Sequence, residues 1–468
     1  MRTQNKETKQ KDISPMIDKT KEFETKPIAA LLWQYALPAV ITQIIASIYN
    51  ICDRVFLGQC VGALAIAGLT VTMPIMNIIH AFGSLVGAGA GARMSIVLGK
   101  RDIPWAENIL GNTMLLSIFF GLLYVPAWYI FNDDILSLFG ASAETIAYAK
   151  EYMNIVIPGM FFTTVTFNLT SLIRSTGYSK KSMWIMIFGA ILNILLDGLF
   201  IYVLDMGIAG AAWATTISMG TSAILAISHF VSKRAFIRFR SHAWTPRFYI
   251  FRNILAIGIS PFSMNVAGSA VAALLNNQLL YHGGDNAVAA SGVANSFGPL
   301  VIMLVIGICQ GMQPIAGYNY GAGRLDRLRE VFGLAMKCNI TIGIIGSLLV
   351  LFVPRYLAMA FTTDAELLDL CVPALRFMLV MSPLIGFTIT NSQFFQSIDK
   401  PWIAIVTSLS RQVLILIPMI YIIPPIFESL GWSGLNGVFA SCTVSDILGA
   451  ALAGYLLYTQ RGILQKRK

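Results

Sequence analysis

Twelve long apolar runs dominate this sequence. They lie near residues 28–57, 63–98, 105–131, 142–174, 181–204, 208–231, 248–281, 287–320, 327–353, 364–398, 401–424 and 433–460. A helix needs about 20 apolar residues to cross a bilayer, and each run is long enough. Only 12% of the residues are Asp, Glu, Lys or Arg, whereas a soluble domain carries about 25%. The sequence therefore predicts an all-α polytopic membrane protein with twelve transmembrane helices, and it excludes a soluble enzyme, a secreted domain and a disordered chain.

The 33 basic residues exceed the 23 acidic ones, and the excess gathers in alternate connections between the runs. One side of the membrane would hold the N-terminal tail, Lys100, Arg101, Arg174, Lys180, Lys181, Lys233, Arg234, Arg238, Arg240, Arg247, Arg252, Arg324, Arg327, Arg329, Lys400, Arg461, Lys466, Arg467 and Lys468. Basic loops stay on the cytoplasmic side of a membrane, so both termini are predicted to be cytoplasmic. The net charge of +10 then reflects topology and implies no nucleic-acid partner.

The second half of the chain repeats the first. Pro261 lies 223 positions after Pro38, and Asn276 lies 223 positions after Asp53. The Gly-x-x-Gly pattern that begins at Gly207 occurs again at Gly434. Each half holds six spans, so both halves start on the same side and form a parallel repeat. The predicted organisation is a polar tail (1–26), an N-terminal six-helix lobe (27–231), a cytoplasmic linker (232–247), a C-terminal six-helix lobe (248–460) and a basic tail (461–468). A parallel repeat of this kind is typical of transporters.

Three sequence motifs resemble one transporter family. They are YNICDRVFLG at residues 49–58, ILNILLD at residues 191–197 followed by GIAGAAWAT at residues 207–215, and RSTGY at residues 174–178. The chain is similar from about residue 28 to 460 to the multidrug and toxic compound extrusion (MATE) family, chiefly to its DinF-like and MepA-like bacterial branches. The resemblance implies two lobes around a central cleft, no cofactor, and a monomer in the bacterial cytoplasmic membrane. It also implies secondary-active export of small amphiphilic, often cationic compounds in exchange for H⁺ or Na⁺.

Four polar residues are predicted to share one depth in the outer half of the N-terminal lobe. Asp53 lies about one turn before the outer end of the first span, and Asn193 and Asp197 occupy one face of the fifth. Asp197 and Thr215 lie equally far from the turn near Met206. Oxygen ligands suit a hard cation, and neighbouring carboxylates raise a pKa, which suits a proton carrier. We therefore expect a coupling site for H⁺, or for Na⁺ as a bound metal ion.

The resemblance implies the same role for these positions. Two plainer alternatives remain: Asp53 could only anchor its helix, and the other three residues could form an interhelical hydrogen-bond network. The second half has Asn276 where the first has Asp53, so coupling is predicted to be confined to the N-terminal lobe. A further membrane acid, Asp446, is expected to have a structural partner.

In the family, a proline matching Pro38 is linked to bending of the first helix; a static kink is the alternative here.

The substrate cavity is expected to have flexible and aromatic walls, because such side chains adapt to varied apolar shapes. The candidates are Tyr49, Asn50, Met73, Met76, Asn168, Met264, Asn265 and Asn276. The glycines at 83, 87, 89 and 91 form a small-residue stripe and predict close helix packing.

The alternatives are a flippase for lipid-linked precursors, a major-facilitator transporter and a membrane enzyme. A flippase of this superfamily usually has fourteen spans and a cationic cavity, neither of which this sequence shows. The loop at residues 99–104 lacks the major-facilitator motif. The six cysteines and four histidines are scattered without metal-ligand spacing, and no nucleophile–base grouping indicates an enzyme.

Overall fold

The computed structural model describes residues 22–60, 63–139, 145–232, 235–362 and 364–464. For residues 50–60, 63–68, 70, 463 and 464 it describes the backbone alone. The described chain is almost entirely helical and contains no strand.

The N lobe, residues 28–231, contains six spans. They are α3 (Ile28–Cys60), α4 (Ala63–Gly99), α5 (Ile103–Leu138), α6 (Ile146–Ser175), α7 (Ser179–Asp197) with the π-helix η1 (Gly198–Val203), and α8 (Gly207–Val231). The largest departure from the predicted bounds is at the end of α5, which was expected at residue 131. The backbone of Phe131 is non-helical, but the helix resumes after that kink.

The C lobe, residues 248–459, begins with the 74-residue helix α9 (Phe248–Gly321). It continues with α10 (Leu325–Phe352), α11 (Pro354–Met359), α12 (Ala365–Leu379), α13 (Ser382–Ser397), α14 (Pro401–Leu409), the π-helix η3 (Ser410–Leu416), α15 (Ile417–Ser429) and α16 (Gly434–Thr459). The short helix α17 (Arg461–Leu464) follows the lobe. Eleven described helical segments are long and apolar enough to cross a membrane. Because α9 reverses at Gly284, where φ is +66°, it supplies two spans, which gives the predicted twelve.

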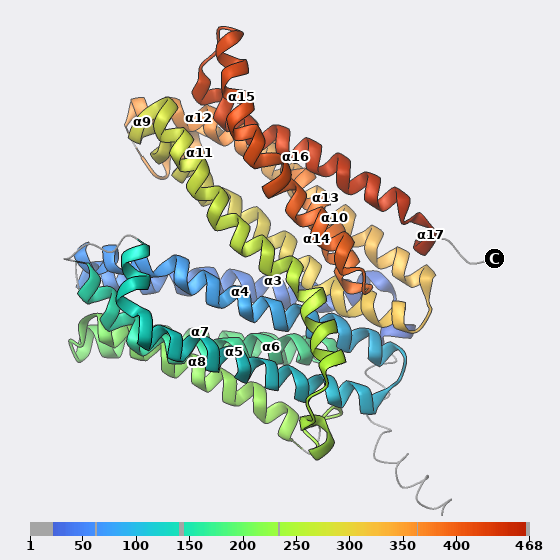
Figure 1. The fold of residues 1–468 in the computed structure, drawn as a ribbon. Coiled ribbons are helices and arrows are strands. Elements are labelled where there is room, and N and C mark those ends of the chain that lie inside the picture. The colour runs from blue at the N-terminus through green and yellow to red at the C-terminus, as the bar shows by residue number, and fades with distance from the viewer. Residues whose placement is uncertain (1–21, 61–62, 140–144, 233–234, 363, 465–468) are drawn as a thin grey trace, which may run out of the picture.

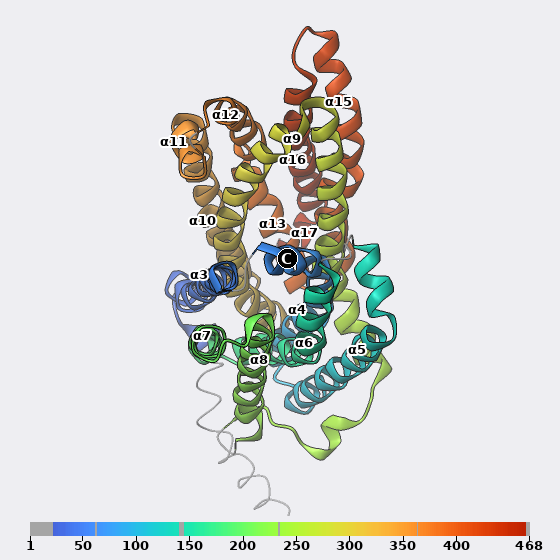
Figure 2. The same ribbon diagram turned by 90° about the vertical axis from the view of Figure 1, so that its left-hand side faces the viewer.

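The two lobes converge at one end and diverge at the other (Figure 1). The view in Figure 2 shows α3 and α7 of the N lobe almost end-on, while α10 and α15 of the C lobe run lengthwise. The converging end carries the loops after α4 and α9, with Lys100, Arg101 and Arg324, and the first turn of α10, with Arg327; we call it the basic end. One apolar cluster crosses from the N lobe into α9 and α10 at this end, whereas the far end of the C lobe has a separate cluster.

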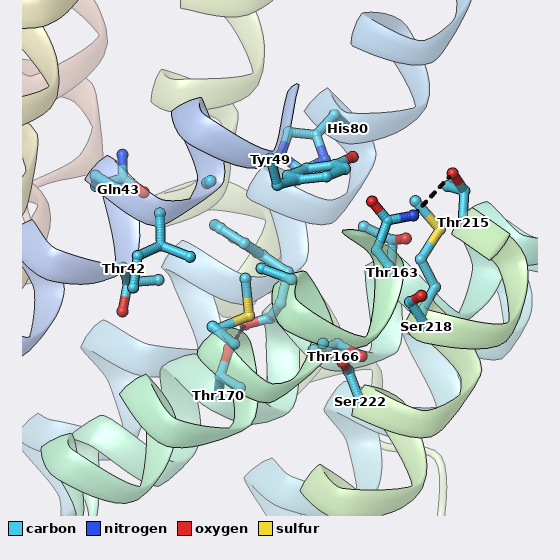
Figure 3. A pocket seen from close by; sticks show the side chains of 18 of the residues that line it. Thr42, Gln43, Tyr49, His80, Thr163, Thr166, Thr170, Thr215, Ser218 and Ser222 are labelled. Atoms are coloured by element: carbon cyan, nitrogen blue, oxygen red, sulfur yellow. Dashed lines mark hydrogen bonds between the residues drawn. The ribbon is translucent and has the colours of Figure 1, made fainter. Parts of the chain in front are cut away.

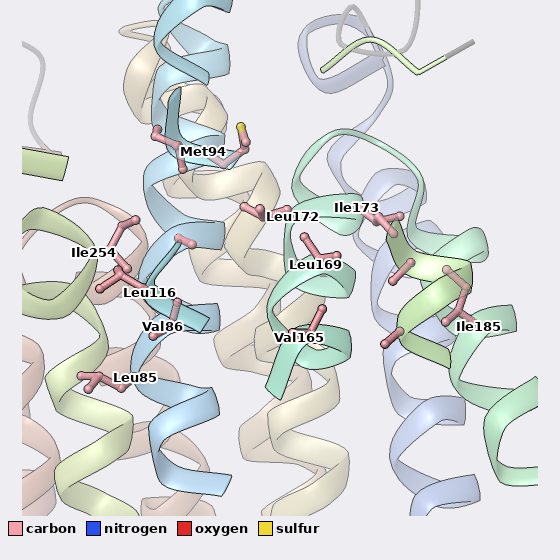
Figure 4. Packing of buried hydrophobic residues seen from close by; sticks show 14 of the residues in the cluster. Leu85, Val86, Met94, Leu116, Val165, Leu169, Leu172, Ile173, Ile185 and Ile254 are labelled. Atoms are coloured by element: carbon pink, nitrogen blue, oxygen red, sulfur yellow. The ribbon is translucent and has the colours of Figure 1, made fainter. Parts of the chain in front are cut away.

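Glycines bring the lobes together at the basic end. A Cβ atom at Gly258 on α9 would collide with the carbonyl group of Leu85 on α4, and one at Gly89 would collide with that of Ile254. Figure 4 shows Ile254 packed beside Leu85 and other apolar residues of α4. An ion pair between Arg93 Nη1 and Asp399 Oδ2, 2.6 Å apart, also joins the lobes. The predicted small-residue stripe therefore serves helix packing: Gly83, Gly87 and Gly91 pack against α6 within the N lobe, and Gly89 packs against α9 of the C lobe.

The connection between the lobes is packed against α5. Residues 241–244 form the 3-10 helix η2 (Ser241–Trp244), and Gly111 on α5 leaves room for the carbonyl group of Ala243. Asn112 Nδ2 donates to Thr245 O at 3.2 Å, and Asn112 Oδ1 accepts from Arg247 N at 2.8 Å. The described part of the linker is therefore held to the N lobe.

Candidate substrate and ion site

A cavity with a volume of about 350 Å³ lies mainly in the N lobe, and Gln310 of α9 adds to its wall. Figure 3 shows that its lining side chains come from several helices that meet around it. The lining residues are Thr42, Gln43, Ile45, Ala46, Tyr49, Met76, Asn77, His80, Met160, Thr163, Thr166, Phe167, Thr170, Arg174, Met186, Gly189, Ala190, Asn193, Thr215, Ser218, Met219, Ser222 and Gln310. The wall thus combines hydroxyl and amide groups with methionine and aromatic surfaces.

One face of α6 supplies much of the polar wall. Thr163, Thr166, Thr170 and Arg174 recur at helical spacing and all line the cavity. Arg174 is the one charged side chain in the described lining, and its Nη1 donates to Ser182 Oγ at 3.4 Å. The cavity therefore offers many neutral hydrogen-bonding groups and little fixed charge, which suits amphiphilic ligands of varied shape.

Three of the four predicted coupling residues lie together beside this cavity. Asn193 Nδ2 on α7 donates to Thr215 Oγ1 on α8 at 3.3 Å, and both residues line the cavity. Asp197 lies one turn after Asn193 and is fully buried, directly before the π-helix η1. Asn193 Oδ1 is buried without a hydrogen-bond donor among the described residues. Amide, hydroxyl and carboxylate oxygens on two neighbouring helices fit the donor set expected for a hard cation.

The fourth predicted coupling residue, Asp53, lies in helix α3. The side chains of Asp53 and Asn50 are outside the described part of the structure. Helix α3 packs against α7 and η1.

The eight candidate cavity residues divide into several groups. Tyr49 and Met76 line the N-lobe cavity, and Met73 on α4 is 37% exposed. Asn168 is fully buried and donates from Nδ2 to Ser117 Oγ at 2.8 Å. It faces α5 and the small-residue stripe rather than the cavity, because Thr166 and Thr170, two positions away on the opposite face of α6, line the cavity wall. Its position therefore favours helix packing over a substrate contact.

The C-lobe candidates lie in other places. Met264 lines a small cavity of about 40 Å³ beside Ser260 and Arg411, while Asn265 and Asn276 are exposed on α9. In the same lobe, Arg411 Nη1 lies 2.5 Å from Asp446 Oδ1, and the Asp446 side chain is 4% exposed. Asp446 thus has the structural partner expected for it.

Pro38 lies within α3, which continues without interruption from Ile28 to Cys60. The flanking residues Ala36 and Val40 touch the backbones of Gly311 and Gly307 on α9, where no side chain would fit. The proline therefore lies where helix α3 contacts the C lobe.

Several cavity residues were not among the predictions, including Gln43, His80 and Gln310. The polar face of α6 could have been found, since threonines at helical spacing inside an apolar run form a stripe. By contrast, His80 and Gln310 stand alone in apolar sequence, and only the tertiary packing brings them to the cavity.

Comparison with known proteins identifies the architecture. A family model described as MatE matches residues 38–199 and again residues 257–422, one match in each lobe. The chain belongs to the MatE family. Members of this family are transporters and not enzymes, and the predicted two-lobe, twelve-span fold is confirmed.

Individual relatives agree with the family match. This MatE protein is 26% identical over 439 residues to the multidrug export protein MepA of Staphylococcus aureus (strain MSSA476), covering 94% of this chain and 95% of that protein. A solved structure described as the outward-facing conformation of a MATE family multidrug resistance transporter superposes with a TM-score of 0.85 at 24% identity, covering 94% and 97% of the two chains. A solved chain described as "protein A" has 33% identity and a TM-score of 0.86, with coverage of 94% and 97%.

Proposed function

We propose that this MatE protein is a secondary-active exporter of small amphiphilic, often cationic compounds, which it exchanges for H⁺ or Na⁺. The observation that carries the proposal is the N-lobe cavity, because its wall includes Asn193 and Thr215 of the predicted ion site. The similarity to a protein named multidrug export protein MepA supports export of drug-like compounds.

The shared wall suggests competition between substrate and ion. A bound compound that contacts Asn193 or Thr215 takes hydrogen-bonding groups that the ion would also use. Loading Asp53 and Asp197 with a proton or Na⁺ would then favour the state that releases substrate. This coupling works only if the ion has different affinities for the two conformations.

The donor set supports either ion. The oxygens of Asn193, Asp197 and Thr215 are hard ligands of the kind Na⁺ takes. A buried carboxylate also holds a proton more readily than an exposed one, because desolvation disfavours its charged form.

The basic end would face the cytoplasm, because basic loops stay on that side. Both termini would then be cytoplasmic, in a bacterial cytoplasmic membrane, and we expect a monomer. Since the lobes converge at the basic end (Figure 1), this arrangement corresponds to an outward-facing state.

Transport in everted membrane vesicles tests the proposal. A fluorescent amphiphilic cation should accumulate when the vesicle lumen is made acidic, or when it is loaded with Na⁺, and the two gradients should be imposed separately. Accumulation with one gradient names the coupling ion. No accumulation with either gradient, from protein that is present in the membrane, would contradict the exporter assignment.

A matched pair of variants tests the ion site. Asp197→Asn removes a buried carboxyl charge, so gradient-driven accumulation should fall about tenfold or more, since coupling requires state-dependent ion binding. Asp205→Asn changes an exposed carboxylate in the nearby loop and should accumulate the dye like the parent. Parental transport by Asp197→Asn would remove Asp197 from the coupling site.

A lipid-linked precursor flippase is the second candidate. Its pyrophosphate group would need several cations, and the described N-lobe cavity wall has Arg174 alone. This charge distribution favours the exporter.

A further inference from the structure

The segment just before the first span is enclosed by both lobes. Residues 22–25 form a helical turn, and Phe23 within it is fully buried. Its ring lies 5.2 Å from that of Tyr35 on α3 and is stacked 5.1 Å from that of Tyr318 on α9, measured between centroids. Tyr35 belongs to the N lobe and Tyr318 to the C lobe, so the Phe23 ring packs between the two lobes.

The neighbouring carboxylate also bridges the lobes. Glu24 Oε1 accepts from Tyr318 Oη at 2.8 Å and from Arg101 Nη2 at 3.2 Å, and Oε2 accepts from Arg324 Nη2 at 2.6 Å. Arg101 belongs to the N lobe, while the other two donors belong to the C lobe. Hydrogen bonds between charged groups are stronger than neutral ones, and the Glu24 side chain is only 10% exposed.

Arginines of the C lobe hold the backbone of the segment as well. Arg327 Nε donates to Phe23 O at 3.1 Å and its Nη2 donates to Lys26 O at 2.6 Å. Arg324 Nη1 donates to Glu24 O at 3.1 Å. These groups bind three main-chain carbonyl groups of the segment, so the contact is a binding surface and more than a single ion pair.

The lobes also meet closely in the same region. A Cβ atom at Gly99 would collide with the carbonyl group of Tyr318, and one at Gly321 would collide with that of Ile96. Any motion that separates the lobes at the basic end must pull Tyr35 and Arg101 away from Tyr318 and its neighbours. A segment bound to both sides resists that motion.

We infer that residues 22–26 are a latch, which binds the surface formed by Tyr35, Arg101, Tyr318, Arg324 and Arg327 and holds the lobes together at the basic end. The inference rests on the proposed function in one respect, that the lobes separate at this end during transport. A contact made in one conformation only shifts the equilibrium toward that conformation. The latch therefore stabilises the closed basic end, and its release is a step of the transport cycle.

Spin-label distance measurements on the full chain test the latch without substrate or ion gradient. Labels at Lys180→Cys on α7 and Trp402→Cys on α14 report the separation of the lobes at the basic end, since both residues are exposed there. The background should have its six cysteines replaced and should keep its fold. Glu24→Gln should raise the ratio of separated to closed lobes about tenfold, because it weakens several charge-assisted hydrogen bonds.

A neighbouring carboxylate is the matched control. Glu22 Oε2 contacts Lys26 Nζ and Gln34 Nε2, which belong to the same segment and to α3. Glu22→Gln removes the same charge two residues earlier without touching the C lobe, so it should leave the distance distribution unchanged. Distributions that are the same in Glu24→Gln, Glu22→Gln and parent would overturn the inference.

A reversible cross-link provides a second test should Glu24→Gln fail to fold. Glu24→Cys and Arg324→Cys, joined by a cleavable bifunctional thiol reagent, should block transport and recover it after cleavage. Full transport by the cross-linked protein would show that release is not required. Because the spin-label experiment needs no transported compound, failure of the exporter assignment and failure of the latch are distinguishable.

Discussion

The two buried membrane carboxylates Asp446 and Asp197 lie in different places, one beside an arginine and the other one helical turn from the cavity wall. Asp446 lies against the guanidinium group of Arg411, whose cation balances its charge inside the C lobe. Asp197 lies one turn from an amide that is bonded to a hydroxyl group at the cavity wall. A buried cation keeps its partner carboxylate charged, which gives Asp446 a structural role, whereas the coupling role of Asp197 is our proposal.

This contrast predicts a large stability loss for Asp446→Asn. The change leaves Arg411 charged and poorly accessible without its anion, which typically costs about 3–5 kcal/mol. Thermal unfolding in detergent should show a clearly lowered midpoint. The control is Asp369→Asn, which breaks an exposed pair with Arg355 and should change stability by less than about 1 kcal/mol. Equal midpoints for the two variants would contradict a structural role for Asp446.

At the scale of elements, close helix contacts join the two lobes. Helix α9 approaches α4 through glycines that leave no room for a Cβ atom, and α3 meets α9 beside Pro38. The fifth span of each lobe carries a π-helical stretch, η1 in the N lobe and η3 in the C lobe. Such stretches often occur at functional sites, and η1 begins directly after Asp197.

Gly258→Ala should therefore push α4 and α9 apart. The new methyl group meets the main chain of Leu85, which a side-chain rotation cannot relieve. We expect a destabilisation of about 1–3 kcal/mol, measured as a lower unfolding temperature. Gly268→Ala on the same helix has open space around it and should be neutral or slightly stabilising, because alanine favours helix. An unchanged unfolding temperature in Gly258→Ala would contradict a close contact between α9 and the main chain of Leu85 on α4.

At the scale of the whole molecule, the two lobes share one apolar cluster at the basic end, whereas the far end of the C lobe has an apolar cluster of its own. The latch lies across that shared end, outside the membrane spans. Burial alone would raise the pKa of Glu24, but the hydrogen bonds and positive charges around it lower the pKa by more, so the net value is below the ordinary one. A lowered pKa means that the carboxylate stabilises the closed end wherever it is ionised, and that this stabilisation is lost as pH falls through the folded-state pKa.

The latch should therefore be insensitive to pH near neutrality. The difference between parent and Glu24→Gln in the closed fraction should stay constant from pH 8 to about 5.5, and it should shrink below the ordinary glutamate pKa of about 4.3. Taking the difference between the two proteins removes the effect of protonation elsewhere. Spin-label distances across this pH range provide the measurement, and a difference that disappears at neutral pH would contradict the charge-based latch.

Much of the architecture could be predicted from the sequence, because a bilayer forces long apolar helices and basic loops sort to one side. Span bounds, the two-lobe plan and the family followed from runs, repeats and motifs. Asn193 and Thr215 could be paired because helical periodicity and the distance to a tight turn fix their depth. The same reasoning named Asn168 but not Thr166 and Thr170, since half a turn of the helix decides which residue faces a cavity.

The sequence by itself determined the number of spans, the repeat and which acids lie at membrane depth, since these depend on local composition and periodicity. The tertiary structure alone decided which groups meet across distances in the chain, such as Glu24 with Arg324, 300 residues apart. It also decided the partner of Asp446 and the place of His80 in the cavity wall. The physical reason is that a residue's depth follows from its own helix, whereas its neighbours depend on how every helix rotates and packs against the others.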